Sequence, residues 1–345
     1  MNFTTIKKLP PMEEIIQQFP LSEAAHTAVL ENRKEIEGIL QGRDPRLIII
    51  VGPCSAWPRE AVLEYASKLK ILQKKVKNRL KLVMRTYIQK PRTTKGWLGP
   101  VNQPEPFEAP DIASGIRYTR DMMVKIVEMG LPIADEALFT NNAKGFLELL
   151  SWVAIGARSS EDQEHRIFAS AIDCPVGIKN PTHGSLEIAV NGIVAAQHPH
   201  VAVFDGHEVQ THGNPFAHLV LRGGNGKPNY STKHLKEAEK YMFKNKVNNP
   251  AIIIDASHDN SLVEKKKNHT QQIKVVEAVM HSLSEDPDLK KIVKGFMLES
   301  FIKSGNQKLN PAKPESLDRE GLSITDPCLS WEETERLLFN LAKRP

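Results

Sequence analysis

Short apolar runs recur along the chain from residue 47 onward, and longer segments with helical spacing separate them. Most of these runs are apolar without alternation, which is typical of strands buried on both faces. The pattern predicts strands at Leu47–Val51, Leu82–Thr86, Leu131–Asp135, Val153–Gly156, Pro175–Lys179, Val201–Phe204, Ala251–Asp255 and Val293–Leu298. It predicts helices at Leu21–Leu40, Arg59–Lys77, Ile112–Met129, Ala143–Leu150, Ser160–Ile172, Leu186–Gln197, Lys233–Lys246, Ser261–Ser284 and Trp331–Lys343.

Eight alternations of strand and helix indicate an α/β fold, a closed (β/α)8 or TIM barrel. A doubly wound open sheet is the alternative, but it does not need eight repeats. We expect an N-terminal arm and helix over residues 1–45 and one barrel domain over 46–345. The segment after the predicted sixth strand contains two short β-like runs around Gly213-Asn214-Pro215. We therefore expect an inserted β-hairpin, at about residues 206–230.

Composition and charge narrow the class of protein. The 345 residues include 46 Lys+Arg and 41 Asp+Glu, and the resulting net charge of +5 is too small and dispersed to indicate nucleic-acid binding. The basic run Lys265–Lys267 falls in a helical pattern and is interpreted as a solvated face. No apolar run approaches the roughly 20 residues of a membrane span. The three separated cysteines and the polar N-terminus favour a cytoplasmic protein without disulfides.

Polar residues follow the predicted strands with unusual regularity. In a barrel these strand ends meet at one face, where catalytic groups collect. Six of the residues are cations, namely Arg85, Lys90, Arg92, Arg158, Lys179 and Arg222. Any one of them could form a surface salt bridge, but six at one mouth would repel each other without a polyanion. The pattern therefore favours phosphate and carboxylate ligands.

A second set of strand-end residues has mixed chemistry. Cys54, His258, Glu299 and Asp326 offer a thiolate, an imidazole and two carboxylates, a donor set that suits Mn, Fe, Co or Zn. Barrel topology would bring the ends of the first, seventh and eighth strands side by side. Other interpretations remain open. Cys54 could be a small buried hydrophobe, His258 could cap a strand, and the two carboxylates could pair with the arginines.

Short motifs occur in an order that resembles one family over nearly the whole chain from about Leu9. They are GPCS at Gly52–Ser55, KPRTTKGW at Lys90–Trp97, GAR at Gly156–Arg158, QxHR at Gln163–Arg166, CPVGIKN at Cys174–Asn180, LRGG at Leu221–Gly224, PNYS at Pro228–Ser231, DASHDNS at Asp255–Ser261, ES at Glu299–Ser300, GNQ at Gly305–Gln307 and SITDPC at Ser323–Cys328. The chain thus resembles type I 3-deoxy-D-arabino-heptulosonate 7-phosphate (DAHP) synthase, of the microbial feedback-regulated subtype.

The resemblance implies a metal-dependent condensation of phosphoenolpyruvate with erythrose 4-phosphate, the first step of the shikimate pathway. It implies that Cys54, His258, Glu299 and Asp326 hold one divalent metal ion. The residues matching the phosphoenolpyruvate site are Arg85, Lys90, Ala157, Arg158, Lys179 and Arg222. Those matching the erythrose 4-phosphate site are Pro91, Arg92, Thr93 and Thr94. Catalytic roles would fall to Lys90, Glu136 and His258, and the family resemblance implies a homodimer or homotetramer.

The sequence also departs from the family pattern. Where the family reads GPCSIHD, this chain has Ala56-Trp57-Pro58 after the presumed ligand Cys54. Ala137 and Asp173 replace a phenylalanine and a serine of the inhibitor pocket, and the arm lacks the family's acidic pair, so we expect altered, weak or absent feedback inhibition. Two alternative functions stay open. One is condensation of phosphoenolpyruvate with another aldose phosphate, and the other is a non-catalytic regulatory paralogue.

Overall fold

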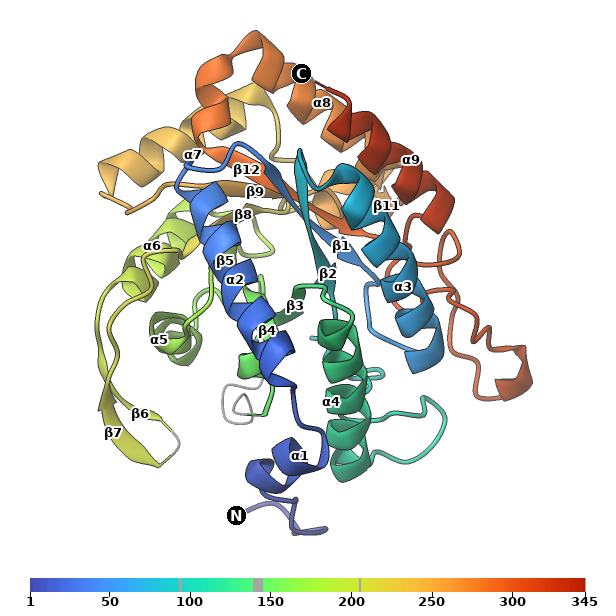
Figure 1. The fold of residues 1–345 in the computed structure, drawn as a ribbon. Helices are drawn as coiled ribbons and strands as arrows, with labels where there is room; N and C mark the ends of the chain where they lie inside the picture. The colour runs from blue at the N-terminus through green and yellow to red at the C-terminus, as the bar shows by residue number, and fades with distance from the viewer. Residues whose placement is uncertain (93–94, 139–144, 205, 345) are drawn as a thin grey trace.

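The computed structural model describes residues 1–92, 95–138, 145–204 and 206–344 (Figure 1). Eight parallel strands close into a barrel, in the order β1-β12-β9-β8-β5-β4-β3-β2. The predicted barrel is therefore confirmed. Its strands are β1 (Leu47–Gly52), β2 (Leu80–Arg85), β3 (Ile133–Glu136), β4 (Leu150–Ile155), β5 (Val176–Lys179), β8 (His218–Leu221), β9 (Ile252–Asp255) and β12 (Val293–Glu299).

Helices cover the outside of the barrel. Polar side chains begin several of them, and at Ser330 a capping box with Glu333 satisfies two backbone N–H groups. The α-helices after the first strand are α3 (Arg59–Val76), α4 (Ile112–Glu128), α5 (Gln163–Ala171), α6 (Leu186–Gln197), α7 (Thr232–Lys244), α8 (Gln271–Glu285) and α9 (Trp331–Ala342). Short 3-10 helices are η2 (Leu147–Leu149), η3 (His258–Ser261), η4 (Pro287–Lys291) and η5 (Pro314–Ser316). No helix among the described residues is long and apolar enough to cross a membrane.

Two helices precede the barrel, α1 (Met12–Gln18) and α2 (Glu23–Leu40). Ile36, Ile39 and Leu40 of α2 are buried in one cluster with Ile48 of β1 and Trp152 of β4. This packing removes apolar surface from water, which stabilises the fold by about 25 cal/mol for each Å² buried. The N-terminal segment is thus attached to the barrel through its own hydrophobic contacts.

The inserted hairpin differs from the prediction in position. It consists of β6 (Val201–Phe204) and β7 (His207–Gln210), which pair antiparallel outside the barrel, and the sixth barrel strand is β8. Every residue of β8 is buried, whereas Val201 and Val203 are 70% and 76% exposed. The β-branched composition of β6 signals a strand, but it carries no information about which sheet the strand joins.

The segment from 261 to 270 also differs from the prediction. Instead of the start of a long helix it contains a small hairpin of β10 (Leu262–Val263) and β11 (Lys266–Lys267), and α8 begins only at Gln271. Glu264 and Lys265 adopt positive φ angles of 48° and 63°, which end helical continuation there. The basic run Lys265–Lys267 is therefore exposed, as predicted, but it lies in a hairpin and the prediction of a helix there was wrong. Of the predicted helix at 143–150, the described part forms only η2 before β4.

Candidate active site

A cavity of about 180 Å³ opens at the carboxyl ends of the barrel strands. It is lined by Cys54, Lys90, Pro91, Arg92, Glu136, Ala157, Arg158, Lys179, Arg222, His258, Lys267, Thr325 and Asp326. Eleven of these thirteen residues were singled out from the sequence. Of the other predicted site residues, Arg85 and Glu299 lie buried at the ends of β2 and β12. Thr93 and Thr94 lie outside the described residues.

The described lining of this cavity is strongly cationic. Lys90, Arg92, Arg158, Lys179, Arg222 and Lys267 contribute six positive charges against the carboxylates of Glu136 and Asp326. Five of the six are the cations that the strand-end pattern indicated. Lys267 was missed because its hairpin was interpreted as helix. Such an excess in a partly enclosed space suits a ligand with several anionic groups.

Arg85 lies fully buried beneath the cavity, at the end of β2. Its guanidinium Nη2 lies 3.2 Å from Glu299 Oε1, and both side chains are fully buried. Ser257 Oγ donates to the other carboxylate oxygen of Glu299 at 2.7 Å. Burial opposes ionisation of Glu299, but the nearby His258 and Arg85 hold its pKa below the ordinary value. Arg85 Nη1 is buried and has no hydrogen-bond partner in the described chain.

Lys90 contacts Cys54 at two atoms. Its Nζ donates to the Cys54 carbonyl oxygen at 2.8 Å and lies 3.2 Å from Cys54 Sγ. Burial raises the pKa of the Cys54 thiol, and the charge of Lys90 opposes that rise. Burial likewise disfavours the Lys90 ammonium, but Cys54 and Glu299 raise the Lys90 pKa. A charged amine is therefore held beside the thiol.

Three candidate metal donors come together in this corner. One ligand atom each from Cys54, Glu299 and Asp326 lies within 4.8 Å of the other two. The fourth predicted donor, His258, lines the same cavity but is not part of this group, and its Nδ1 lies 2.9 Å from Asp255 Oδ2 without forming a hydrogen bond. A thiol, an imidazole and two carboxylates fit a divalent transition ion. The donors also contact cations, since Asp326 pairs with Lys267 as Glu299 does with Arg85.

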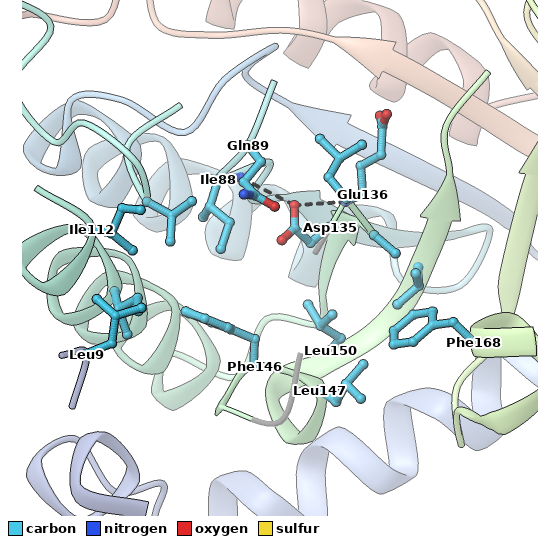
Figure 2. Close-up of a pocket in the computed structure, with 15 residues that line it drawn as sticks. Leu9, Ile88, Gln89, Ile112, Asp135, Glu136, Phe146, Leu147, Leu150 and Phe168 are labelled. Carbon is cyan, nitrogen blue, oxygen red and sulfur yellow. Dashed lines mark hydrogen bonds between the residues drawn. The ribbon is translucent and has the colours of Figure 1, made fainter. Parts of the chain in front are cut away.

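Glu136 faces the cations from β3. Its Oε2 lies 3.7 Å from Lys179 Nζ, which is also 3.5 Å from Asp255 Oδ2. A Cβ built on Gly156 would come within 2.2 Å of Glu136 Oε1, so glycine is needed there for the carboxylate to occupy its place. Figure 2 shows that the Glu136 carboxylate points away from the apolar end of a neighbouring cavity, where Leu9 and Phe146 lie.

Tyr87 lies among the cations of this site, although the pattern of polar residues at the strand ends does not indicate it. Three cations surround its buried ring, with the Arg85 Cζ 4.0 Å, the Lys179 Nζ 5.6 Å and the Lys90 Nζ 5.7 Å from its centroid. An aromatic face attracts cations and eases their mutual repulsion. Tyr87 follows β2 by two residues, but a tyrosine between Thr86 and Ile88 carries no charge that would indicate a site.

One of the departures after Cys54, Trp57, lies in an aromatic cluster. Trp57 is buried with Trp97 and Ile324, and its Nε1 donates to the Pro104 carbonyl oxygen at 2.8 Å. Its ring meets that of Trp97 edge-on, at 6.4 Å between centroids. Trp57 is therefore fixed by packing in the segment that follows Cys54.

Comparison with known proteins gives consistent matches over almost the full length. The model of the DAHP synthetase I family matches residues 19–339. A protein of Salmonella typhimurium, phospho-2-dehydro-3-deoxyheptonate aldolase, Tyr-sensitive, is 41% identical over 99% of this chain and 95% of its own length. The Phe-sensitive protein of Escherichia coli K12 is 40% identical, over 99% and 96%.

A solved structure agrees with these sequence matches. The structure of phospho-2-dehydro-3-deoxyheptonate aldolase from Francisella tularensis superposes with a TM-score of 0.91 at 36% identity, covering 99% of this chain and 98% of that one. The sequence identity extends over whole chains, and the relatives share the barrel fold with this chain. The chain belongs to the DAHP synthetase I family of enzymes.

Proposed function

We propose that this protein condenses phosphoenolpyruvate with erythrose 4-phosphate and water to give DAHP and phosphate, the first step of the shikimate pathway. The observation that carries the proposal is the cationic cavity at the barrel mouth, with its three clustered metal donors. Phosphoenolpyruvate brings a carboxylate and a phosphate, and the aldose brings a second phosphate. Six lining cations match three anionic groups.

In this proposal the two substrates divide the cavity. Phosphoenolpyruvate is bound by Arg85, Lys90, Ala157, Arg158, Lys179 and Arg222, and Pro91 and Arg92, with Thr93 and Thr94, bind the aldose phosphate. Arg85 acts from below the cavity, where its unpartnered Nη1 supports a role in binding an anion. Holding both substrates in one enclosed space converts a bimolecular encounter into a unimolecular step.

The reaction forms one carbon–carbon bond, and at C2 of phosphoenolpyruvate a bond to the oxygen of water replaces the bond to the phosphate oxygen. C3 of phosphoenolpyruvate attacks the aldehyde carbon, water adds at C2, and the C2–O bond to phosphate breaks. Lys90 donates a proton to the new alkoxide, because its raised pKa keeps the amine protonated and its contact with Cys54 places it beside the candidate metal donors. Glu136 accepts a proton from the attacking water. Its carboxylate lies beside Lys179 and lines the cavity.

One divalent ion, Mn, Fe, Co or Zn, would be held by Cys54, His258, Glu299 and Asp326. When bound, such an ion polarises a carbonyl oxygen as a Lewis acid. Asp255 would orient the His258 ring through the contact at 2.9 Å. The family resemblance also supports a cytoplasmic homodimer or homotetramer, which light scattering on the purified protein would test.

The decisive experiment measures DAHP formation from phosphoenolpyruvate and a panel of aldose phosphates. We expect turnover with erythrose 4-phosphate and little with five-carbon aldose phosphates. Lys179→Met should abolish turnover, whereas Lys240→Met, on the exposed side of α7, should not. Preference for another aldose would support the related condensing enzyme instead. No turnover with any added divalent metal would support the non-catalytic paralogue.

A further inference from the structure

A second cavity, of about 600 Å³, opens at the opposite end of the barrel. Leu47, Leu80 and Val293, the first residues of β1, β2 and β12, form part of its wall. Apolar residues of α8 and α9, namely Met280, Leu283 and Leu341, form another part. Because these are the amino ends of the strands, this basal cavity is separate from the candidate active site.

The basal cavity is strongly cationic. Its described lining contains the six cations Arg46, Arg79, Lys290, Lys291, Lys294 and Arg344, against the single carboxylate of Asp44. Arg46 pairs with Asp44 and Glu35, and Lys291 pairs with Asp288. The side chains of the other four cations form no ion pair with any carboxylate of the described chain. Among the described residues, four of the six cations of this cavity thus have no carboxylate partner within ion-pair distance.

Lys294 is a mostly buried member of this set of cations. It lies on β12 and is only 7% exposed, yet its ammonium has no hydrogen bond or ion pair within the described residues. Lys294 Nζ would be 3.3 Å from a Cβ built on Gly42, whose φ of +75° favours glycine. Burial lowers the pKa of Lys294, and no carboxylate counteracts it. Lys294 therefore presents to the cavity an ammonium that its partial burial disfavours, and an anion bound there would stabilise the charged form.

We propose that the basal cavity binds a phosphate ester that also carries a ring, a ligand of the nucleotide class. The four cations without carboxylate partners suit a phosphate group or a pair of them. The apolar wall from β1, β2, α8 and α9 suits a ring, which inorganic phosphate lacks. The volume of about 600 Å³ lies within the range of small-molecule sites. This binding is independent of the proposed condensation.

Competitive acetylation read by mass spectrometry tests this site at residue resolution. The whole protein is labelled with acetic anhydride, with and without ADP as the probe, in the presence of phosphoenolpyruvate, which the proposed function places on the active-site cations. We expect ADP at about ten times its dissociation constant to reduce labelling of Lys294 about tenfold. Labelling of the exposed Lys240 should not change. Unaltered labelling of Lys294 overturns the proposal.

Two variants and a second probe separate the remaining explanations. Lys294→Met and the more exposed Arg344→Gln should each weaken ADP binding at least about tenfold by calorimetry, with kcat and KM for phosphoenolpyruvate unchanged. Pyrophosphate should bind more weakly than ADP, and equal affinity would overturn the role given to the apolar wall. Loss of condensing activity with intact protection of Lys294 would contradict the proposed function while supporting this inference.

Discussion

Lys90 Nζ lies 2.8 Å from the carbonyl oxygen and 3.2 Å from the sulfur of Cys54, so one amine connects the cationic cavity to the candidate metal donors. If Lys90 protonates the new alkoxide, Lys90→Met should lower kcat by on the order of 10²-fold or more. Steady-state kinetics with both substrates measures this effect. The exposed Lys70→Met on α3 is the matched control, and a Lys90 variant with near-normal kcat would exclude the acid role.

Much of the candidate site was predictable because parallel barrel strands present their carboxyl ends at one face. Once the strands ending at Arg85, Glu136 and Glu299 were located, their side chains had to converge. The donors Cys54 and Asp326 followed from the same topology together with the family motifs. These predictions depended on strand order, and small errors in strand boundaries did not affect them.

The failures have physical causes as specific as the successes. The run Val201–Phe204 has strand composition but packs in a separate hairpin, because strand propensity does not encode the partner strand. Lys267 contacts Asp326 because the chain turns at Glu264 and Lys265. Both residues have positive φ angles, which could not be predicted because Glu and Lys rarely adopt them. Tyr87 contacts the cations through its aromatic face, and the sequence of an uncharged residue does not indicate such contacts.

Tyr87 should tune substrate binding by holding three cations together. Tyr87→Leu removes the ring that Arg85, Lys90 and Lys179 surround. The variant loses about 1–2 kcal/mol of cation–π attraction, so we expect KM for phosphoenolpyruvate to rise about tenfold or more. Tyr87→Phe keeps the ring and loses only a hydroxyl whose contact is Met297 Sδ at 3.8 Å. It should retain a KM near the original value. Equal KM changes in both variants would argue against the aromatic face.

Asp326 offers the cleanest test of the metal proposal because its side chain is 33% exposed and should tolerate substitution. Asp326→Asn should weaken Mn²⁺ binding at least about tenfold in equilibrium dialysis, since a charged donor is replaced by a neutral amide. Asp318→Asn, which breaks the comparable pair with Lys303, is the control. For the original protein, dialysis against a chelator should remove activity and Mn²⁺ should restore it. Unchanged Mn²⁺ binding by the Asp326→Asn variant would remove Asp326 from the ligand set.

Feedback inhibition is the property in which we expect this chain to differ from its named relatives. Ala137 lines the apolar cavity beside Phe168 that Figure 2 shows, where the family pattern has a bulkier phenylalanine. We expect Phe, Tyr or Trp to inhibit weakly or not at all, measured as initial rates at rising amino-acid concentration. A strong fall in rate with any one of the three would show that the altered pocket still works.

Asp135 should make the free energy of unfolding depend on pH between about pH 4 and about pH 8. Figure 2 shows its buried carboxylate between the backbone N–H groups of Glu136 and Ile88, which donate to it at 2.8 and 3.3 Å. Burial raises the pKa of Asp135 to about 8, far above its unfolded value of 3.8. The folded state therefore holds a proton that the unfolded chain releases, and this contribution to stability is complete below about pH 4 and is lost as the pH rises to about 8.

Asp135→Asn removes the titration, so its stability relative to the original protein should increase from about pH 5 to about pH 8 in urea unfolding. The exposed Asp288→Asn is the control, and a pH-independent difference for Asp135→Asn would contradict the raised pKa.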